Sequence, residues 1–189
     1  MLSLFESISQ DTSPYWTLFL LFLVSLASFF VVRRVLIQII LLATKDIQNI
    51  WVQALLSPKF LFRSGWLTPI IIFYIGLNLL PEDWETQVVV LQRTSLILFT
   101  FFGARTLTAL IDSITKSYSS LAMAKNKPIK GMMQVLSMII YLASFILIIS
   151  VIINKSPWVF LSGLGAMTAI LMLVFKDTIL SFVAGIQIT

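Results

Sequence analysis

The chain has 189 residues, of which 59% are hydrophobic and only 11% are charged, and its mean hydropathy is +1.00. A water-soluble domain of this length does not stay folded and dispersed with so little charge, so the composition excludes that class and indicates an integral membrane protein. The formal net charge is +5. Because the cations lie in loops between apolar runs, we assign them to membrane topology and expect no nucleic-acid partner.

The residue types also limit the chemistry of the protein. Histidine and cysteine are both absent, which excludes disulfides, thiolate or imidazole nucleophiles and soft-metal sites, and removes the commonest general base. The carboxylates are scattered along the chain. We therefore expect no catalytic residues, no metal and no other cofactor, and the protein is not predicted to be an enzyme.

The first apolar run is the first predicted transmembrane segment. Residues 1–13 carry Glu6 and Asp11 but no basic residue, so they lack the positive region of a cleaved signal peptide, and we expect this segment to be retained. Residues 15–32 are uncharged and long enough to cross a hydrocarbon core of roughly 30 Å. We predict that this segment ends at Arg33 and Arg34.

A polar stretch with one apolar face follows the first segment. Over residues 45–57 the periodicity predicts a helix that lies in the cytoplasmic interface. Two interpretations stay open: a sensor of lipid packing or lateral tension, and an ordinary anchor with Trp51 at headgroup depth. The residues on the apolar face are Ile47, Ile50, Trp51, Ala54 and Leu55.

Four more apolar runs follow, and the charges between them predict the orientation of the chain. The predicted spans are residues 66–80, extended at the N-terminal side by Leu61 and Phe62, and residues 87–111, 132–153 and 158–175. Basic residues predominate in loops 33–63 and 112–130, whereas loop 81–86 is acidic. The positive-inside rule then predicts an external N-terminus and a cytoplasmic C-terminus, and only Lys155 disagrees.

Two arginines, Arg93 and Arg105, lie inside the third predicted span. A charge within a membrane span is a functional hypothesis by default, because its burial costs a few kcal/mol. Structural anchoring is the alternative, since Arg93 can reach the outer end or pair with Glu85 or Glu82, and Arg105 lies near the inner end, one heptad before Asp112. The residues that we expect to face lipid or respond to tension are Arg33, Arg34, Trp51, Arg93 and Arg105.

The last predicted span is rich in small residues, which are Ser162, Gly163, Gly165, Ala166 and Ala169. They form small-xxx-small pairs at Ser162/Ala166 and Gly165/Ala169, and such pairs let helix backbones approach closely. Two interpretations stay open: packing against copies of the same helix around a pore, and packing within the bundle of one subunit.

A charged pair follows this span. Residues 158–175 extend roughly 27 Å as a helix, so Lys176 and Asp177 are expected near the cytoplasmic interface. Asp177 suits an N-cap, and apolar positions from Thr178 onward share one face, so we predict a kink at Lys176, Asp177 and Thr178 before a segment along the membrane surface. Lys176 either snorkels or, in an oligomer, forms a cationic ring at a pore mouth.

The run LGAMTAILMLVFKDTILSFVAGI at residues 164–186 resembles the pore-lining third helix of the small-conductance mechanosensitive channel (MscS) family. PIKG at residues 128–131, KSPW at 155–158, SGLGAMTA at 162–169 and LVFKD at 173–177 resemble the five-helix miniconductance (MscM) branch of that family. The resemblance is strongest over residues 128–189. Elsewhere it depends on helix number, loop charge and the Trp51, Ala54 and Leu55 stretch.

The resemblance implies an all-α integral membrane protein with five transmembrane helices per subunit, assembled as a ring. Residues 1–131 would be peripheral and residues 132–189 the channel core. It further implies a homoheptamer in a bacterial-type inner membrane, with a periplasmic N-terminus, which membrane tension opens to release ions and small osmolytes on hypoosmotic shock. The implied partners are further subunits, membrane lipids and permeating solutes. Because the family continues into a cytoplasmic β-domain, we expect further residues after Thr189.

The resemblance also assigns site residues. The two hydrophobic constriction positions of the family fall on Ala169 and Leu173, and its kink falls at Lys176 and Asp177. Ala169 replaces a leucine and Asp177 a glycine of the family prototype, which implies a wider upper constriction and a bend held by a cap. The packing seam of the family maps onto Gly165, Ala166, Thr168, Ile170 and Met172, where the larger Ile170 and Met172 imply a looser or differently registered ring.

Two other functions compete with a channel. A non-conducting membrane scaffold or interaction subunit would explain the small-residue faces equally well. A secondary transporter would carry ionisable groups at mid-membrane depth and paired broken helices, whereas residues 132–175 offer only hydroxyls, Asn154 and Lys155.

Overall fold

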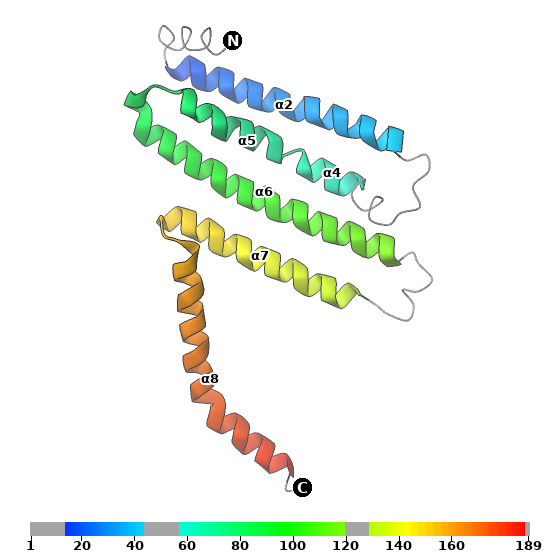
Figure 1. The fold of residues 1–189 in the computed structure, drawn as a ribbon, viewed down its shortest axis with the longest axis vertical. Helices are drawn as coiled ribbons and strands as arrows, with labels where there is room; N and C mark the ends of the chain where they lie inside the picture. The colour runs from blue at the N-terminus through cyan, green and yellow to red at the C-terminus, as the bar shows by residue number, and fades with distance from the viewer. Residues whose placement is uncertain (1–13, 44–56, 120–128, 188–189) are drawn as a thin grey trace. The chain divides into compact units, whose positions relative to one another are not determined.

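The computed structural model describes residues 14–43, 57–119 and 129–187, and within these ranges every element is a helix. Figure 1 shows the helices in chain order. Their bounds are α2 Pro14–Ala43, α4 Pro58–Ser64, α5 Leu67–Gly76, the short 3-10 turns η1 Leu77–Leu79 and η2 Glu82–Trp84, α6 Glu85–Ser119, α7 Lys130–Ile153 and α8 Pro157–Gln187.

Five stretches of the described chain are long and apolar enough to cross a membrane, which confirms the predicted number of spans and a multi-pass membrane protein. They are Pro14–Gln38, Pro58–Leu79, Glu85–Ser119, Lys130–Ile153 and Pro157–Ile186. The predicted interfacial helix at residues 45–57, including Trp51, lies almost wholly outside the described residues and stays a prediction.

The first helix is longer than predicted. It continues through Arg33 and Arg34 to Ala43, so the prediction that the segment ends at these arginines is wrong. Arginine interrupts an apolar pattern, but it is among the better helix formers and leaves the backbone hydrogen bonds intact. For the same reason α6 continues past residue 111, where the apolar run ends, to Ser119.

The second span consists of two helices, α4 and α5, and it begins where the sequence suggested that a helix ends. The hydroxyl of Ser57 accepts a hydrogen bond from the amide of Phe60 at 3.4 Å, and Pro58 occupies the first helical position, where its missing N–H costs nothing. Pro58 therefore starts α4. The span includes Leu61 and Phe62, as predicted.

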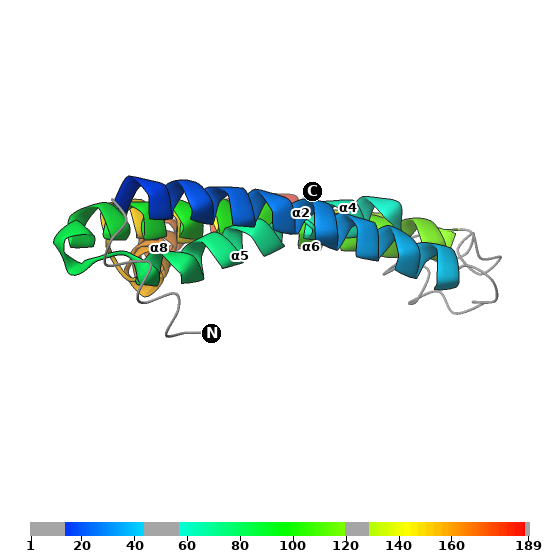
Figure 2. The same ribbon diagram turned by 90° about the horizontal axis from the view of Figure 1, so that it is seen from above.

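The chain divides into two compact units, Met1–Ile148 and Ile149–Thr189. In the first unit α4 and α5 lie between α2 and α6, and Figures 1 and 2 show these helices as a single layer. The backbones of α2 and α5 approach closely, because a Cβ added to Gly76 would lie 2.4 Å from the side chain of Leu21. The division falls within α7, and the predicted grouping of residues 132–153 with the last helix stays a prediction.

Hydrogen bonds between side chains and across helices join the layer. Within the described residues, every buried side-chain nitrogen and oxygen has a partner, as expected for polar groups away from water. The bonds between elements include Ser25 Oγ to the carbonyl of Pro69 at 2.6 Å, Ser57 Oγ with Ser113 Oγ at 2.6 Å, Gln92 Nε2 to Asn78 Oδ1 at 3.0 Å and Thr108 Oγ1 with the Tyr141 hydroxyl at 3.2 Å.

Candidate functional site

The second unit begins with a defined turn at the end of α7. Asn154 has a φ of 56°, in the left-handed region. Its amide donates to the carbonyl of Val151 at 3.4 Å, and the amide of Lys155 donates to the carbonyl of Ser150 at 3.0 Å. This pair of bonds is a Schellman motif, in which asparagine is the favoured alternative to glycine at the left-handed position. The hydroxyl of Ser150 also donates to the carbonyl of Lys155.

The next two residues start α8. Ser156 is the N-cap, because its hydroxyl accepts from the amide of Trp158 at 3.4 Å and its carbonyl accepts from the amide of Val159 at 3.0 Å. Pro157 takes the first helical position. One helix therefore ends at Ile153 and the next begins at Pro157, with three residues between them.

We expect the turn to depend on the residue at position 154. Asn154→Val places a β-branched side chain in the left-handed region and should lower the stability of the folded protein by about 1–2 kcal/mol, whereas Asn154→Gly should change it by less. Thermal unfolding in detergent, followed by circular dichroism, measures both. Equal effects of the two substitutions would contradict a requirement for this backbone conformation.

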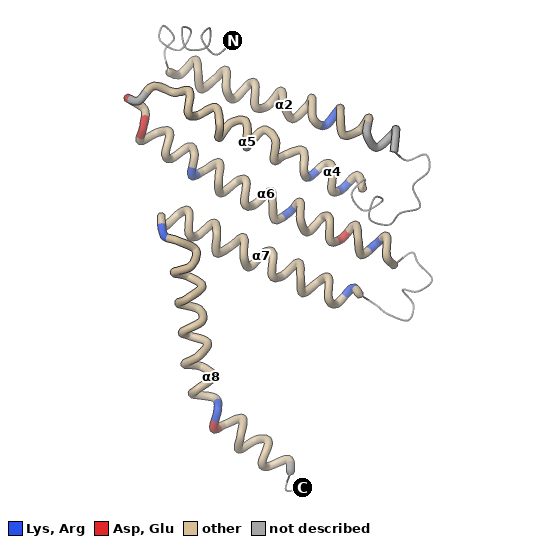
Figure 3. The backbone as a smooth tube through the Cα atoms, viewed as in Figure 1, with Lys and Arg blue, Asp and Glu red and all other residues tan. Residues whose placement is uncertain are grey.

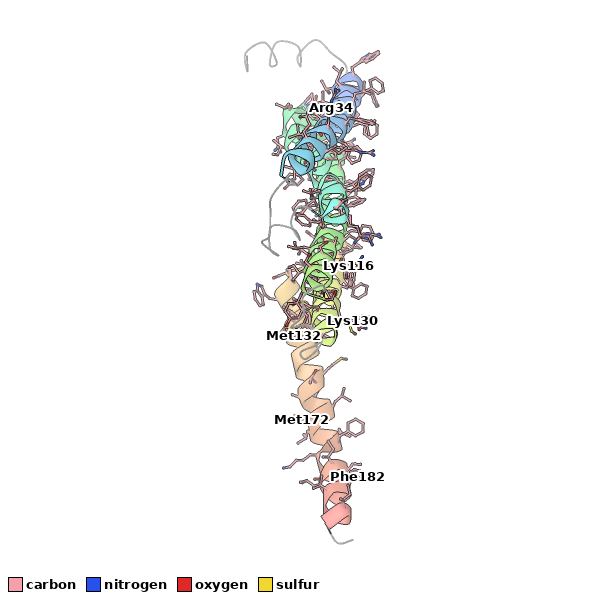
Figure 4. All side chains as sticks on the ribbon, turned by 90° about the vertical axis from the view of Figure 1, so that its right-hand side faces the viewer. Arg34, Lys116, Lys130, Met132, Met172 and Phe182 are labelled. Atoms are coloured by element: carbon pink, nitrogen blue, oxygen red, sulfur yellow. The ribbon has the colours of Figure 1, made fainter. Side chains whose placement is uncertain are left out.

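Helix α8 is exposed along its length. Every described side chain from Leu161 to Ile186 is classed as exposed, including Met172 at 73% and Phe182 at 70%. Figure 4 labels these two side chains, which project from α8 with no other element of their unit beside them. In a bilayer an apolar helix of this kind faces either lipid or another protein chain.

Within the described part of the second unit, nothing packs closely against the glycines of α8. A Cβ added to Gly163 or Gly165 would meet no atom within 4 Å, and Ala166 and Ala169 are exposed. The hydroxyl of Thr168 donates to the carbonyl of Leu164 at 2.8 Å, so this polar side chain is satisfied inside its own helix. What remains available to a partner is a smooth apolar surface.

The predicted constriction residues share one side of α8. Gly165, Ala169 and Leu173 follow each other at intervals of four residues, which places them along one face. Leu173 is 71% exposed. The larger seam residues Ile170 and Met172 are exposed as well, at 62% and 73%.

Lys176, Asp177 and Thr178 lie within a continuous helix. Figure 3 shows the first two as adjacent blue and red segments of α8. Because α8 runs without interruption from Pro157 to Gln187, the interpretation of Asp177 as an N-cap is wrong. Lysine and aspartate cost a helix only a few tenths of a kcal/mol, and no glycine or proline is present at this point to break it. A kink at these residues stays a prediction.

The arginines that were predicted to face lipid lie in the first unit. Arg34 is exposed, Arg33 lies 5.0 Å from the ring centre of Phe62, and Arg105 lies 5.8 Å from that of Phe101. Arg93 is partly buried and lines the same shallow hollow on α6 as Glu85. The suggested pairing of Arg93 with Glu85 or Glu82 stays a prediction.

Sequence reasoning missed one residue at the level of these arginines. Arg63 donates from Nη1 to the backbone carbonyl of Arg105 at 3.3 Å and so joins α4 to α6. The hydropathy pattern places Arg63 in the basic loop 33–63. The Ser57-Pro58 start signal was the available clue, because it places Arg63 in the second turn of a helix.

A hollow of about 810 Å³ in the first unit lies between the ends of α6 and α7. Lys116 and Lys130, both labelled in Figure 4, line it together with Asp112 and Tyr118.

No protein-family model matches this chain, and no solved structure matches it. The functional argument therefore depends on the residues themselves. Its strongest element is α8, which is apolar and rich in small residues, and nothing among the described residues of the second unit packs closely against its glycines.

Proposed function

We propose that the protein is a mechanosensitive channel of the small-conductance type, in which α8 from each of several identical subunits surrounds one pore. The observation that carries the proposal is the exposure of every described side chain from Leu161 to Ile186 on a helix with glycines at Gly163 and Gly165. By the resemblance of residues 128–189 to that family, the ring is a heptamer in a bacterial inner membrane. It would pass ions and small osmolytes under hypoosmotic shock.

The physics of helix association in lipid supports self-assembly through α8. Lipid offers apolar contact as readily as protein does, so apolarity alone does not bring helices together. Small residues do, because they allow backbones to approach and gain van der Waals contact. Gly165 and Ala169 provide such positions one turn apart, and no side chain within 4 Å of Gly165 competes for the space.

A hydrophobic ring provides the closed state without a plug. Leu173 from each subunit, one turn after Ala169, would form a narrow apolar constriction that loses its water and blocks ions. Tension favours whichever state occupies more membrane area, and a switch requires such a difference in free energy between its two states.

Excised-patch recording under graded suction tests the proposal. Purified protein, with any residues that follow Thr189 included, is reconstituted into vesicles and patched. Stepwise currents that appear above a threshold suction and vanish on its release are expected. A scaffold would give no unitary currents at any suction below patch rupture, and a transporter would move solute without unitary steps. Either result would overturn the proposal that the protein is a channel.

A further inference from the structure

Four arginines from three helices lie at one level of the first unit. Arg33 and Arg34 are in α2, Arg63 is in α4 and Arg105 is in α6. Figure 3 draws the lysines and arginines of α2, α4 and α6 in blue. Two contacts support this placement: Arg33 lies 5.0 Å from the ring centre of Phe62 on α4, and Arg63 reaches the carbonyl of Arg105. We name these four residues the arginine belt.

Helix lengths place the belt at the depth of one headgroup layer. At about 1.5 Å per residue, Arg33 lies about 28 Å from Pro14 along α2, and Arg105 lies about 30 Å from Glu85 along α6. Both values match the roughly 30 Å of a hydrocarbon core. At the far end Tyr15 and Trp84 pack with ring centres 4.9 Å apart, as in the aromatic belt of a membrane interface.

The belt has no counterion within the described chain. Asp83 and Glu85 lie at the opposite end of the layer, and Asp112 lies about 10 Å beyond Arg105 along α6. The neighbours of Arg33 and Arg34 along the chain are valines on both sides. Guanidinium groups in apolar surroundings need a partner of opposite charge, because an unpaired charge there is costly.

An aromatic cluster holds the belt in position. Trp66 stacks on Phe102 with ring centres 5.4 Å apart and lies 4.6 Å from Phe29, so one ring from each of α2, α5's N-terminal cap and α6 is in contact. Arg105 lies over Phe101, the neighbour of Phe102. Aromatic rings attract the guanidinium cations that lie over them, and each guanidinium group has five N–H donors.

We propose that the arginine belt binds the phosphate groups of anionic phospholipids in the adjacent leaflet. Guanidinium groups bind phosphate oxygens with two parallel hydrogen bonds, and cations near a membrane surface attract acidic lipid. Arg33, Arg34 and Arg105 are exposed and Arg63 is partly so, which leaves the belt accessible to headgroups. The proposal requires membrane insertion only and does not depend on the presence of a pore.

Quenching of Trp66 fluorescence by brominated lipids tests the proposal, because Trp66 is 38% exposed within the cluster that holds the belt. The other four tryptophans are replaced by phenylalanine, so that Trp66 alone gives the signal. The full-length protein is reconstituted in phosphatidylcholine vesicles that contain the same fraction of either brominated phosphatidylglycerol or brominated phosphatidylcholine. Stronger quenching by phosphatidylglycerol is expected, and equal quenching by the two lipids would overturn the proposal.

Two matched pairs of variants test whether the arginine belt causes the preference for phosphatidylglycerol. Arg63→Gln with Arg105→Gln should lower the preference for phosphatidylglycerol at least about fivefold, since each cation near the surface contributes about 1 kcal/mol. Lys116→Gln with Lys130→Gln removes the same charge away from the belt and should leave the preference unchanged. Equal losses of this preference in the two pairs of variants would overturn the proposal that the arginine belt binds the lipid specifically. If the first pair fails to fold, Arg33→Gln with Arg34→Gln takes its place.

Discussion

Replacing Leu173 with serine is expected to produce a channel that leaks at resting tension. A hydroxyl in each subunit would hydrate the constriction that the leucine ring keeps dry, and the barrier to ions would fall. Cells that express Leu173→Ser should grow more slowly than cells with the unchanged protein. Patches should show openings at lower suction or without suction, whereas the oligomeric mass should stay the same.

Leu171→Ser is the matched control for this prediction. It makes the same substitution two residues earlier, about 200° around α8, so it lies on nearly the opposite side of the helix. Leu171 is also exposed, at 56%. If Leu171→Ser leaks as much as Leu173→Ser, the effect comes from a polar group anywhere on α8. An unchanged tension threshold and an unchanged conductance in Leu173→Ser would show that Leu173 does not form the pore constriction.

The number and order of the membrane helices could be predicted from the sequence because each apolar run is long enough to span a bilayer. The residues at which the helices end could not be predicted in this way. Hydropathy falls at Arg33 and Arg34, but the backbone of α2 continues to Ala43, because arginine stops an apolar run without stopping a helix. At Pro58 a helix begins, since a proline after serine is a start signal that an apolar pattern alone does not contain.

In the candidate site, too, helical periodicity predicts some features, whereas others depend on tertiary packing. The face that contains Gly165, Ala169 and Leu173 follows from four-residue spacing alone. The bond from Arg63 to the carbonyl of Arg105 joins residues 42 positions apart, and no local pattern announces such a contact. The prediction of an N-cap at Asp177 is wrong for a related reason. Aspartate favours a cap position, but the free-energy cost of aspartate inside a helix is too small to end α8.

A bulky residue at the small-residue face should separate the subunits. Gly165→Trp adds an indole where a Cβ now meets no atom within 4 Å of its own chain, so a single subunit should tolerate the change. In an assembly that brings backbones together at Gly165, the indole would force the helices apart and remove the contact that holds them. We expect loss of the oligomer, measured as mass in mild detergent by light scattering.

Met167→Trp separates assembly from general damage. It places the same side chain two residues later, about 200° around α8, where the existing methionine is 67% exposed. This variant should keep the oligomeric mass of the unchanged protein. If Gly165→Trp also keeps that mass, the self-packing face is misassigned, and packing within one subunit becomes the better explanation. If both variants dissociate, the whole circumference of α8 is in contact with neighbouring subunits, and the face that contains Gly165 has no special role.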